Sequence, residues 1–473
     1  MAVGCKLRPA GSIQHIVASS PEGKAKDMLN DSFQGKSSPV LIARLAFMMF
    51  CQFFIWGAWY VAMWGFLNER GMTELGPGGS FDAAAYTVAP IAALLAPLTI
   101  GLIVDRFFST QYMLSILNLV GAVLLWVAPS LADAGAPATL LQQFSHPMIL
   151  CLLVYMFCFM PTLGLTASLS FRHLENGEKE FPVVRVLGTI GWIAGNWAMW
   201  GCRTVTSSAE FPDNSPHIFH AAAIVSAILG FYCLTLPRTE PTAKGEPISI
   251  GKVLGIDAWV MLKDRAFLIF ALASFLICIP LAGYYAKGYG YVETMGVNLF
   301  GSTTGAMSTG QMSEILFMLI MPVCFARLGV KKMLIIGMAA WALRYGLWGF
   351  AFGQTGPLMT LPIFLGILLH GICYDFFFVT GMIYTDQKSK PEHRGQAQAL
   401  IVMLTQGLGL GIGAQAFGWW TKQTTSVDGN VDFARFWFAP AIFSVVVLVF
   451  FYLMFDAQKD RESSTSISDT SSS

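Results

Sequence analysis

Charged side chains are scarce in this sequence, making up 12% of its 473 residues where an average soluble domain has about 25%. The formal net charge of +1 gives no basis for attraction to nucleic acid. The nine cysteines lie mostly in apolar stretches without metal-ligand spacing, so we expect neither a metal centre nor a disulfide framework. The sequence also lacks His-Glu-x-x-His, Gly-x-Ser-x-Gly and a phosphate-cradling Gly-x-x-x-x-Gly-Lys-Ser/Thr loop. These absences argue against an intramembrane enzyme and against a pump that carries its own ATPase.

The sequence contains many long apolar stretches. Hydrophobic residues make up 55% of the chain, and a membrane-crossing helix needs about 20 of them in a row because its backbone must be satisfied internally. The predicted spans are 43–66, 84–104, 111–132, 148–170, 184–205, 217–236, 266–288, 304–326, 331–352, 358–384, 396–420 and 436–455. The sequence therefore predicts an all-α membrane protein with twelve transmembrane helices in two six-helix bundles.

The connectors divide the chain into five regions. We expect a polar cytoplasmic N-terminal tail at 1–40, a first bundle at 41–236, a cytoplasmic linker at 237–265, a second bundle at 266–456 and a disordered Ser/Thr-rich tail at 457–473. The first tail lacks the apolar core of a signal peptide. A chain of six spans plus six is typical of transporters whose two bundles rock about a central site.

Lysine and arginine in the connectors predict the orientation in the membrane. If both termini are cytoplasmic, the outer connectors hold only Arg70, Arg203, Lys287, Lys422 and Arg435, and the other basic connector residues lie inside. This asymmetry is what the positive-inside rule requires. We therefore expect a multi-pass membrane protein with cytoplasmic termini.

A short motif supports the division into halves. After the second span, residues 101–106 read Gly-Leu-Ile-Val-Asp-Arg, a pattern that resembles the loop between spans two and three of the major facilitator superfamily. In the second half, residues 327–332 form a basic loop at the corresponding place, which is equally typical of an ordinary cytoplasmic loop.

Polar residues inside the fifth span share one helical face. Arg185, Thr189 and Trp192 are spaced at i, i+4 and i+7, and a cation, a hydroxyl and an indole on one stripe suit a polar ligand with a flat ring. The alternative is that Arg185 lies near the cytoplasmic end and extends its head group to the membrane surface.

Two further spans carry acidic residues that membrane interiors tolerate only in cavities or ion pairs. Gln311 and Glu314 share a face of the eighth span, and the tenth span holds His370, Tyr374 and Asp375. The aromatic neighbours of Asp375 exclude water and so favour its protonated form, unless Asp375 is fixed in an ion pair with Arg344 or Arg185. His370 is interpreted as a packing residue more readily than as a ligand.

Aromatic residues in the first and seventh spans are weaker candidates. Trp56 and Tyr60 share a face, one turn after Gln52. The seventh span ends in Tyr284-Tyr285-Ala-Lys287, where the tyrosines can line a cavity or belong to an interfacial aromatic belt.

Six motifs in order make the chain similar to the nucleoside:proton symporter family of the major facilitator superfamily. They are Phe-Phe-Ile-Trp-Gly-Ala-Trp at 53–59, Met-Pro-Thr-Leu-Gly-Leu at 160–165, Phe-Pro-Val-Val-Arg-Val-Leu-Gly-Thr-Ile-Gly at 181–191, Gln-Met-Ser-Glu at 311–314, Ala-Trp-Ala-Leu-Arg-Tyr at 340–345 and Tyr-Asp-Phe-Phe at 374–377. The resemblance covers nearly the whole length from Leu41 to Phe455.

The resemblance implies a substrate site between the halves. The implied substrate-binding residues are Arg185, Thr189, Trp192, Gln311, Glu314, Tyr374 and Asp375, with Asp375 and Glu314 as candidates for proton coupling. Carboxylate, amide and guanidinium groups suit ribose hydroxyls, and an aromatic face suits a base. One departure concerns the seventh span, where Ala282 and Tyr285 stand in place of a Gln and an Asn of the best-known members, which leaves the substrate range open.

The expected function is import of nucleosides by proton symport through alternating access, without cofactor or metal, by a protein that works as a monomer. The alternatives are a proton-coupled carrier of another hydroxylated solute, such as a sugar or oligosaccharide, and a transporter-like sensor that does not transport.

Overall fold

The chain is helical throughout the part that the structure describes. The computed structural model describes residues 37–96, 108–175, 177–208, 211–240, 259–389 and 394–455. Within these ranges every regular element is a helix, and extended pairing is limited to three isolated bridges in turns. The predicted all-α class is confirmed. The motif at 101–106, the C-terminal tail at 457–473, nearly all of the N-terminal tail and most of the linker lie outside the described residues.

The first half of the chain forms ten helical elements in the described ranges. They are α2 (Pro39–Tyr60), α3 (Met63–Glu69), α4 (Phe81–Ala96), α6 (Thr110–Val127), η2 (Ala128–Leu131), α7 (Leu140–Ser145), α8 (Pro147–His173), α9 (Gly177–Asn196), α10 (Ala198–Thr206) and α11 (His217–Cys233). The first and fifth predicted spans are each broken near their second end, into α2–α3 and α9–α10.

The second half continues in the same manner. Its elements are η3 (Val260–Lys263), α14 (Arg265–Thr294), α15 (Thr303–Ala351), α16 (Pro357–Leu368), α17 (His370–Cys373), η4 (Tyr374–Val379), α18 (Thr380–Lys388), α19 (Arg394–Val402), η6 (Met403–Gly409), α20 (Leu410–Thr424) and α21 (Phe433–Met454). Both η4 and η6 are π-helical, a geometry that often marks functional sites.

The predicted spans match these helices one by one. Each overlaps a helix, and eight described helical stretches are long and apolar enough to cross a membrane. The eighth and ninth spans lie within α15, where Gly329 has φ +69° and ψ 174° and turns the chain sharply. A positive φ of this size favours glycine. The count of twelve crossings remains a prediction, because α4 ends where the described residues end and α11 has 17 residues.

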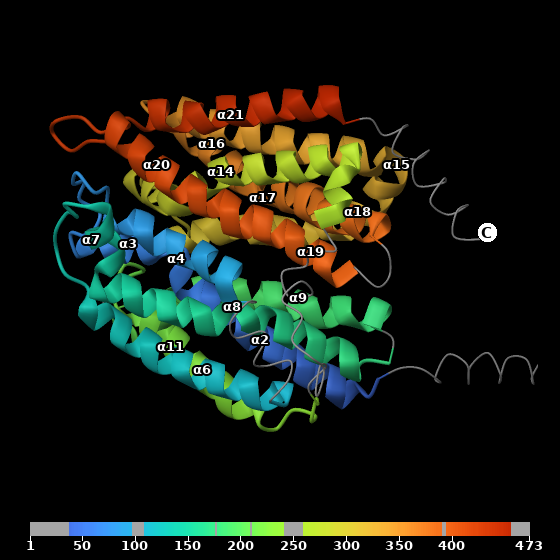
Figure 1. The fold of residues 1–473 in the computed structure, drawn as a ribbon. Coiled ribbons are helices and arrows are strands. Elements are labelled where there is room, and N and C mark those ends of the chain that lie inside the picture. The colour runs from blue at the N-terminus through green and yellow to red at the C-terminus, as the bar shows by residue number, and fades with distance from the viewer. Residues whose placement is uncertain are drawn as a thin grey trace, which may run out of the picture.

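Two large clusters of buried apolar side chains underlie the architecture. One draws almost entirely on residues 45–236 and adds only Ala286 and Tyr289 from α14. The other spans residues 267–455. Figure 1 shows the corresponding groups of helices side by side, with the blue-to-green part of the chain below the yellow-to-red part. We call the end of the bundle where α2 begins and α21 ends the termini end, and the opposite end the far end.

Close packing of α2 on α9 depends on small residues. A Cβ atom at Gly191 would lie 2.1 Å from the carbonyl oxygen of Phe50, and one at Gly195 would lie 2.6 Å from that of Phe54. Only glycine permits such an approach, as in other membrane helix pairs that pack through small residues. The contact fixes the face of α9 that carries Arg185, Thr189 and Trp192 relative to α2.

Polar contacts join the two halves at the far end. Lys287 on α14 forms a buried ion pair with Asp82 on α4, with 2.6 Å between Nζ and Oδ2. The sequence places Lys287 in an outer connector, but the structure buries it inside α14. Asp82 provides the reason, since a buried ammonium group requires a nearby anion.

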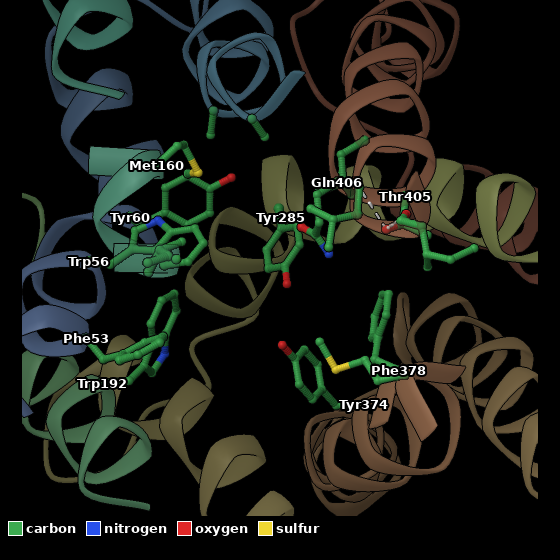
Figure 2. A pocket seen from close by; sticks show the side chains of 18 of the residues that line it. Phe53, Trp56, Tyr60, Met160, Trp192, Tyr285, Tyr374, Phe378, Thr405 and Gln406 are labelled. Carbon is green, nitrogen blue, oxygen red and sulfur yellow. Dashed lines mark hydrogen bonds between the residues drawn. The ribbon is translucent and has the colours of Figure 1, made fainter. Parts of the chain in front are cut away.

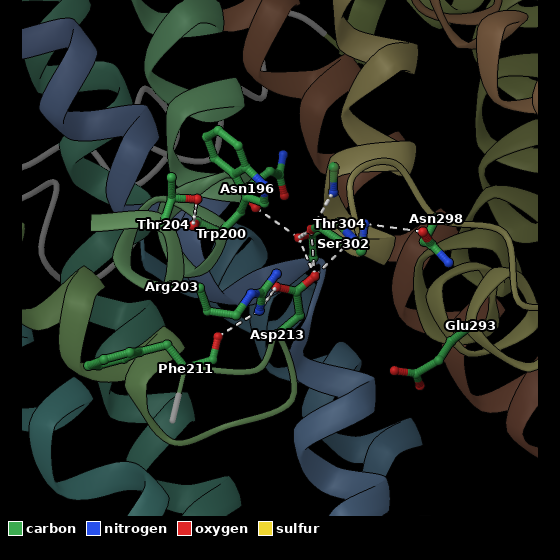
Figure 3. A network of polar contacts seen from close by, with 12 residues as sticks. Asn196, Trp200, Arg203, Thr204, Phe211, Asp213, Glu293, Asn298, Ser302 and Thr304 are labelled. Atoms are coloured by element: carbon green, nitrogen blue, oxygen red, sulfur yellow. Dashed lines mark hydrogen bonds and ion pairs between the residues drawn. The ribbon is translucent and has the colours of Figure 1, made fainter. Parts of the chain in front are cut away.

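A second network at the far end surrounds Asp213 (Figure 3). The hydroxyl groups of Ser302 and Thr304 donate to Asp213 Oδ2 over 2.6 and 2.9 Å, and Arg203 lies 3.2 Å from Oδ1. Ser302 caps the first turn of α15, so the carboxylate of the first half also lies at the positive end of a helix dipole in the second half.

Candidate functional site

A cavity of about 1090 Å³ lies between the two halves. Its wall runs from Tyr289 and Met307 toward the far end to Phe171 and Gln398 toward the termini end. Aromatic side chains dominate the wall in Figure 2, where Trp56 and Trp192 face Tyr374 and other side chains of the second half across the open space. The cavity has the size and the mostly apolar lining with a few polar groups that are typical of small-molecule sites.

The wall of the first half holds the predicted stripe of α9. Arg185, Thr189 and Trp192 all line the cavity. The Arg185 guanidinium lies over the ring of Phe53, 4.1 Å from its centroid, which favours a cavity position over extension to the membrane surface. Trp192 packs edge-on against Trp56, with ring centroids 5.3 Å apart.

The first span contributes to this wall through one face only. Trp56 and Tyr60 line the cavity, whereas Trp59 is buried in the core against Phe219. Gln52 does not line the cavity: its amide donates to Thr162 on α8 over 2.7 Å. Gln52 thus ties the two helices together next to the aromatic wall.

The wall of the second half holds three more predicted residues. Gln311, Glu314 and Tyr374 all line the cavity. Gly371 permits this arrangement, because a Cβ atom there would lie 2.7 Å from the backbone nitrogen of Glu314. Glu314 and Arg185 are near enough for their charges to interact across the cavity.

Asp375 occupies a different position from the other predicted residues. It follows Tyr374 in the π-helical segment η4 but is fully buried and is not among the cavity-lining residues. Neither of its carboxylate oxygens has a hydrogen-bond partner among the described residues. The alternative of a fixed ion pair with Arg344 or Arg185 therefore does not describe this structure. Glu314 is close enough for the two carboxylates to interact.

His370 is both packed and placed at the cavity. Its side chain is buried but lines the wall, with Nδ1 3.3 Å from a terminal nitrogen of Arg344 and Nε2 3.3 Å from the amide nitrogen of Gln311. Glu314 Oε2 lies 4.0 Å from the same Nε2. The sequence allows either a packing role for His370 or a role at the binding site, and the observed position is compatible with both.

Other lining residues are found only with the structure in hand. Tyr284 and Tyr285 both line the cavity, which decides between the cavity and an interfacial belt, while Ala282 is buried behind them. Thr405 and Gln406 on η6 also contribute. A polar pair inside an otherwise apolar span was the available signal for them, but it does not indicate which way the side chains point.

Taken with its long apolar helices, a cavity held between two helical bundles defines a polytopic membrane transporter. Residues 40–460 match the family model described as nucleoside H+ symporter. The chain belongs to the nucleoside H+ symporter family, so the expectation of a carrier rather than an enzyme is confirmed.

Individual relatives agree with this assignment. The chain is 38% identical to the putative nucleoside transporter YegT of Escherichia coli K12 over 427 residues, which cover 89% of this chain and 95% of the relative. It is 30% identical to the nucleoside permease NupG of the same organism, over 87% of this chain and 95% of the relative. A crystal structure of the nucleoside transporter NupG superposes with a TM-score of 0.73 at 28% identity, covering 88% of this chain and 99% of that one.

Proposed function

We propose that the cavity binds one nucleoside between the two halves and that the protein imports it together with protons. The observation that carries this proposal is that two predicted sets of residues, one from each half, line the same cavity. Arg185, Thr189 and Trp192 come from α9, while the other set, Gln311, Glu314 and Tyr374, comes from α15 and η4, and all six line the same space.

The chemistry of the two sets suits the two parts of a nucleoside. The Glu314 carboxylate accepts hydrogen bonds from ribose hydroxyls, and Arg185 donates to hydroxyl and base oxygens. The rings of Trp192, Trp56 and Tyr374 offer faces for a planar base. A free sugar has hydroxyls but no base, so the aromatic faces favour a nucleoside.

Proton coupling is assigned to the two carboxyl groups of the second half. In the part of the chain that the structure describes, neither carboxylate oxygen of Asp375 has a hydrogen-bond partner, and the residue is buried next to the wall that carries Glu314. A carboxylate buried without a partner is costly in a membrane protein, so a bound proton is the natural way to stabilise it. Asp375 is the proposed proton carrier. Glu314 lines the cavity and is close to Asp375, so in this proposal it interacts with the bound solute and responds to the protonation of Asp375.

Alternating access is the proposed route across the membrane. The ion pair of Asp82 with Lys287 and the Asp213 network hold the halves together at the far end, while the cavity wall extends toward the termini end. We assign the termini end to the cytoplasm on the basis of the basic connectors. The units that rock are the bundles 41–236 and 266–456, within a monomer of the inner membrane.

Uptake of a radiolabelled nucleoside panel tests the proposal in cells that lack their own nucleoside carriers. We expect saturable uptake that a protonophore collapses and that excess glucose or lactose leaves unchanged. Competition by the sugars would indicate a carrier of other hydroxylated solutes. Uptake that survives the protonophore would exclude proton coupling.

Binding measurements locate the site. Uridine should protect the purified wild-type protein against thermal unfolding, and this protection should disappear in Glu314→Ala. Undiminished protection in single alanine variants of Arg185, Thr189, Gln311 and Glu314 would show that the solute binds elsewhere.

A further inference from the structure

Arg344 is a buried cation with no ion pair in the described parts of the chain. Its side chain is fully buried in α15, and its guanidinium carbon lies 3.6 Å from the centre of the Tyr284 ring. A cation–π contact stabilises such a charge in part. The guanidinium is also 3.3 Å from Nδ1 of His370, so Arg344 contacts two residues of the cavity wall, Tyr284 and His370.

The contact between Arg344 and His370 determines where the imidazole carries its proton. A guanidinium has N–H donors only and cannot accept a hydrogen bond. Nδ1 of His370 must therefore accept, which leaves the proton of the neutral ring on Nε2. The Nε2–H group points toward Gln311 and Glu314, at 3.3 and 4.0 Å.

This proton position in turn decides the orientation of the Gln311 amide. In the structure the amide nitrogen faces His370 Nε2, and the amide oxygen is buried with no hydrogen-bond partner among the described residues. Two donors that face each other do not form a hydrogen bond. Half a turn of the amide brings its oxygen to His370 Nε2–H, where it accepts.

We propose that Arg344 and His370 are a positioning pair that fixes the Gln311 side chain in the cavity wall, with the Gln311 amide oxygen accepting from His370 Nε2–H. This inference rests on the proposed nucleoside site. Arg344 does not line the cavity. It contacts two lining residues, His370 and Tyr284, and its proposed effect on Gln311 is transmitted by His370.

Nitrogen-15 spectra of histidine-labelled protein test the proton position without any transport assay. The chain has seven histidines, and the difference from a His370→Phe sample identifies the signals of His370. We expect a protonated Nε2 and an unprotonated Nδ1 in the wild type, and a mixture of the two tautomers in Arg344→Gln. A wild-type signal with the proton on Nδ1 would overturn the inference, even if every Arg344 variant failed to fold.

Uridine uptake kinetics test the positioning role. Arg344→Gln and His370→Phe should each raise KM about tenfold with Vmax retained, a factor that corresponds to about 1.4 kcal/mol. In the His370→Phe background, Arg344→Gln should have no further effect. An equal effect of Arg344→Gln in both backgrounds would show a general structural role and contradict the inference.

Two further variants complete the test. Gln311→Glu keeps an acceptor toward His370 Nε2–H, so it should raise KM less than Gln311→Ala, which removes the acceptor. An equal rise of KM in both variants would contradict the hydrogen bond from His370 to Gln311. Arg435→Gln is the matched control, since Arg435 also lies over an aromatic ring, that of Trp420, and is not part of the cavity wall. If uridine binding is unchanged in both Gln311→Ala and Glu314→Ala, the proposed site itself fails, whatever the spectra show.

Discussion

The two walls of the cavity differ in the number and kind of charged and titratable side chains on or near them. Among the described lining residues, the first half offers one cation, Arg185, which is stacked on an aromatic ring and set on helices that pack through glycines. The second half holds two carboxyl groups, a histidine and a buried arginine around the π-helical segment η4. Rigid packing and aromatic faces suit recognition of a solute, whereas buried carboxyl groups suit the uptake and release of protons. The contrast suggests that binding is shared between the halves while coupling is carried by the second.

The strongest test of this division replaces Asp375. Asp375→Asn mimics the protonated carboxyl group, so we expect uphill uptake driven by a proton gradient to be lost completely while exchange of nucleoside across the membrane continues. Accumulation and exchange in proteoliposomes separate the two. Asp428→Asn in an exposed turn is the control and should behave as the wild type. Normal accumulation by Asp375→Asn would move the coupling role to Glu314.

The next largest effect concerns the ion pair through which the halves meet. Lys287→Met leaves Asp82 buried without its partner, so the free energy of unfolding should fall by about 3–5 kcal/mol. The double variant Asp82→Asn/Lys287→Met removes both charges and should recover most of that loss. Chemical unfolding of the purified proteins measures the difference. Equal stability of the single and double variants would mean that the pair does not hold the halves together.

Binding itself compares the two walls directly. Glu314→Ala on one wall and Arg185→Ala on the other each remove a charged group that we propose to contact the solute, and each should weaken uridine binding by about 2–4 kcal/mol. Isothermal titration calorimetry on purified protein measures both. A loss confined to one variant would show that only one half recognises the solute.

The smallest effect is expected from the aromatic stripe. Trp192→Ala removes one ring face and should weaken uridine binding by about 1 kcal/mol, with proton coupling intact. Trp192→Phe should restore most of the affinity. A loss of proton coupling in Trp192→Ala would contradict the proposal that only the second half couples transport to protons.

Much of the site could be predicted from spacing alone. Arg185, Thr189 and Trp192 share a helical face, as do Gln311 and Glu314, and these five residues do line one cavity. Helical periodicity fixes which side chains share a face. Burying a charge in a membrane costs free energy, so a helical face that carries one is a candidate for a functional site.

The position of Asp375 could not be predicted in the same way. It is adjacent in sequence to Tyr374, which lines the cavity, yet it lies behind the wall without a partner. Adjacent residues on a helix point in different directions, and the π-helical turn of η4 changes the local spacing further. Periodicity says nothing about such a local change in winding.

The sequence by itself determined the class of the molecule, because apolar length and scarce charge leave few structures other than a bundle of membrane helices. It also determined which polar residues share a helical face, since that depends only on local geometry. Tertiary structure alone decided which faces meet. The pairing of Lys287 with Asp82, the contact of Arg344 with His370 and the placement of Tyr285 in the wall all join residues far apart in the chain. Such contacts depend on how the helices pack against one another, which no local pattern in the sequence encodes.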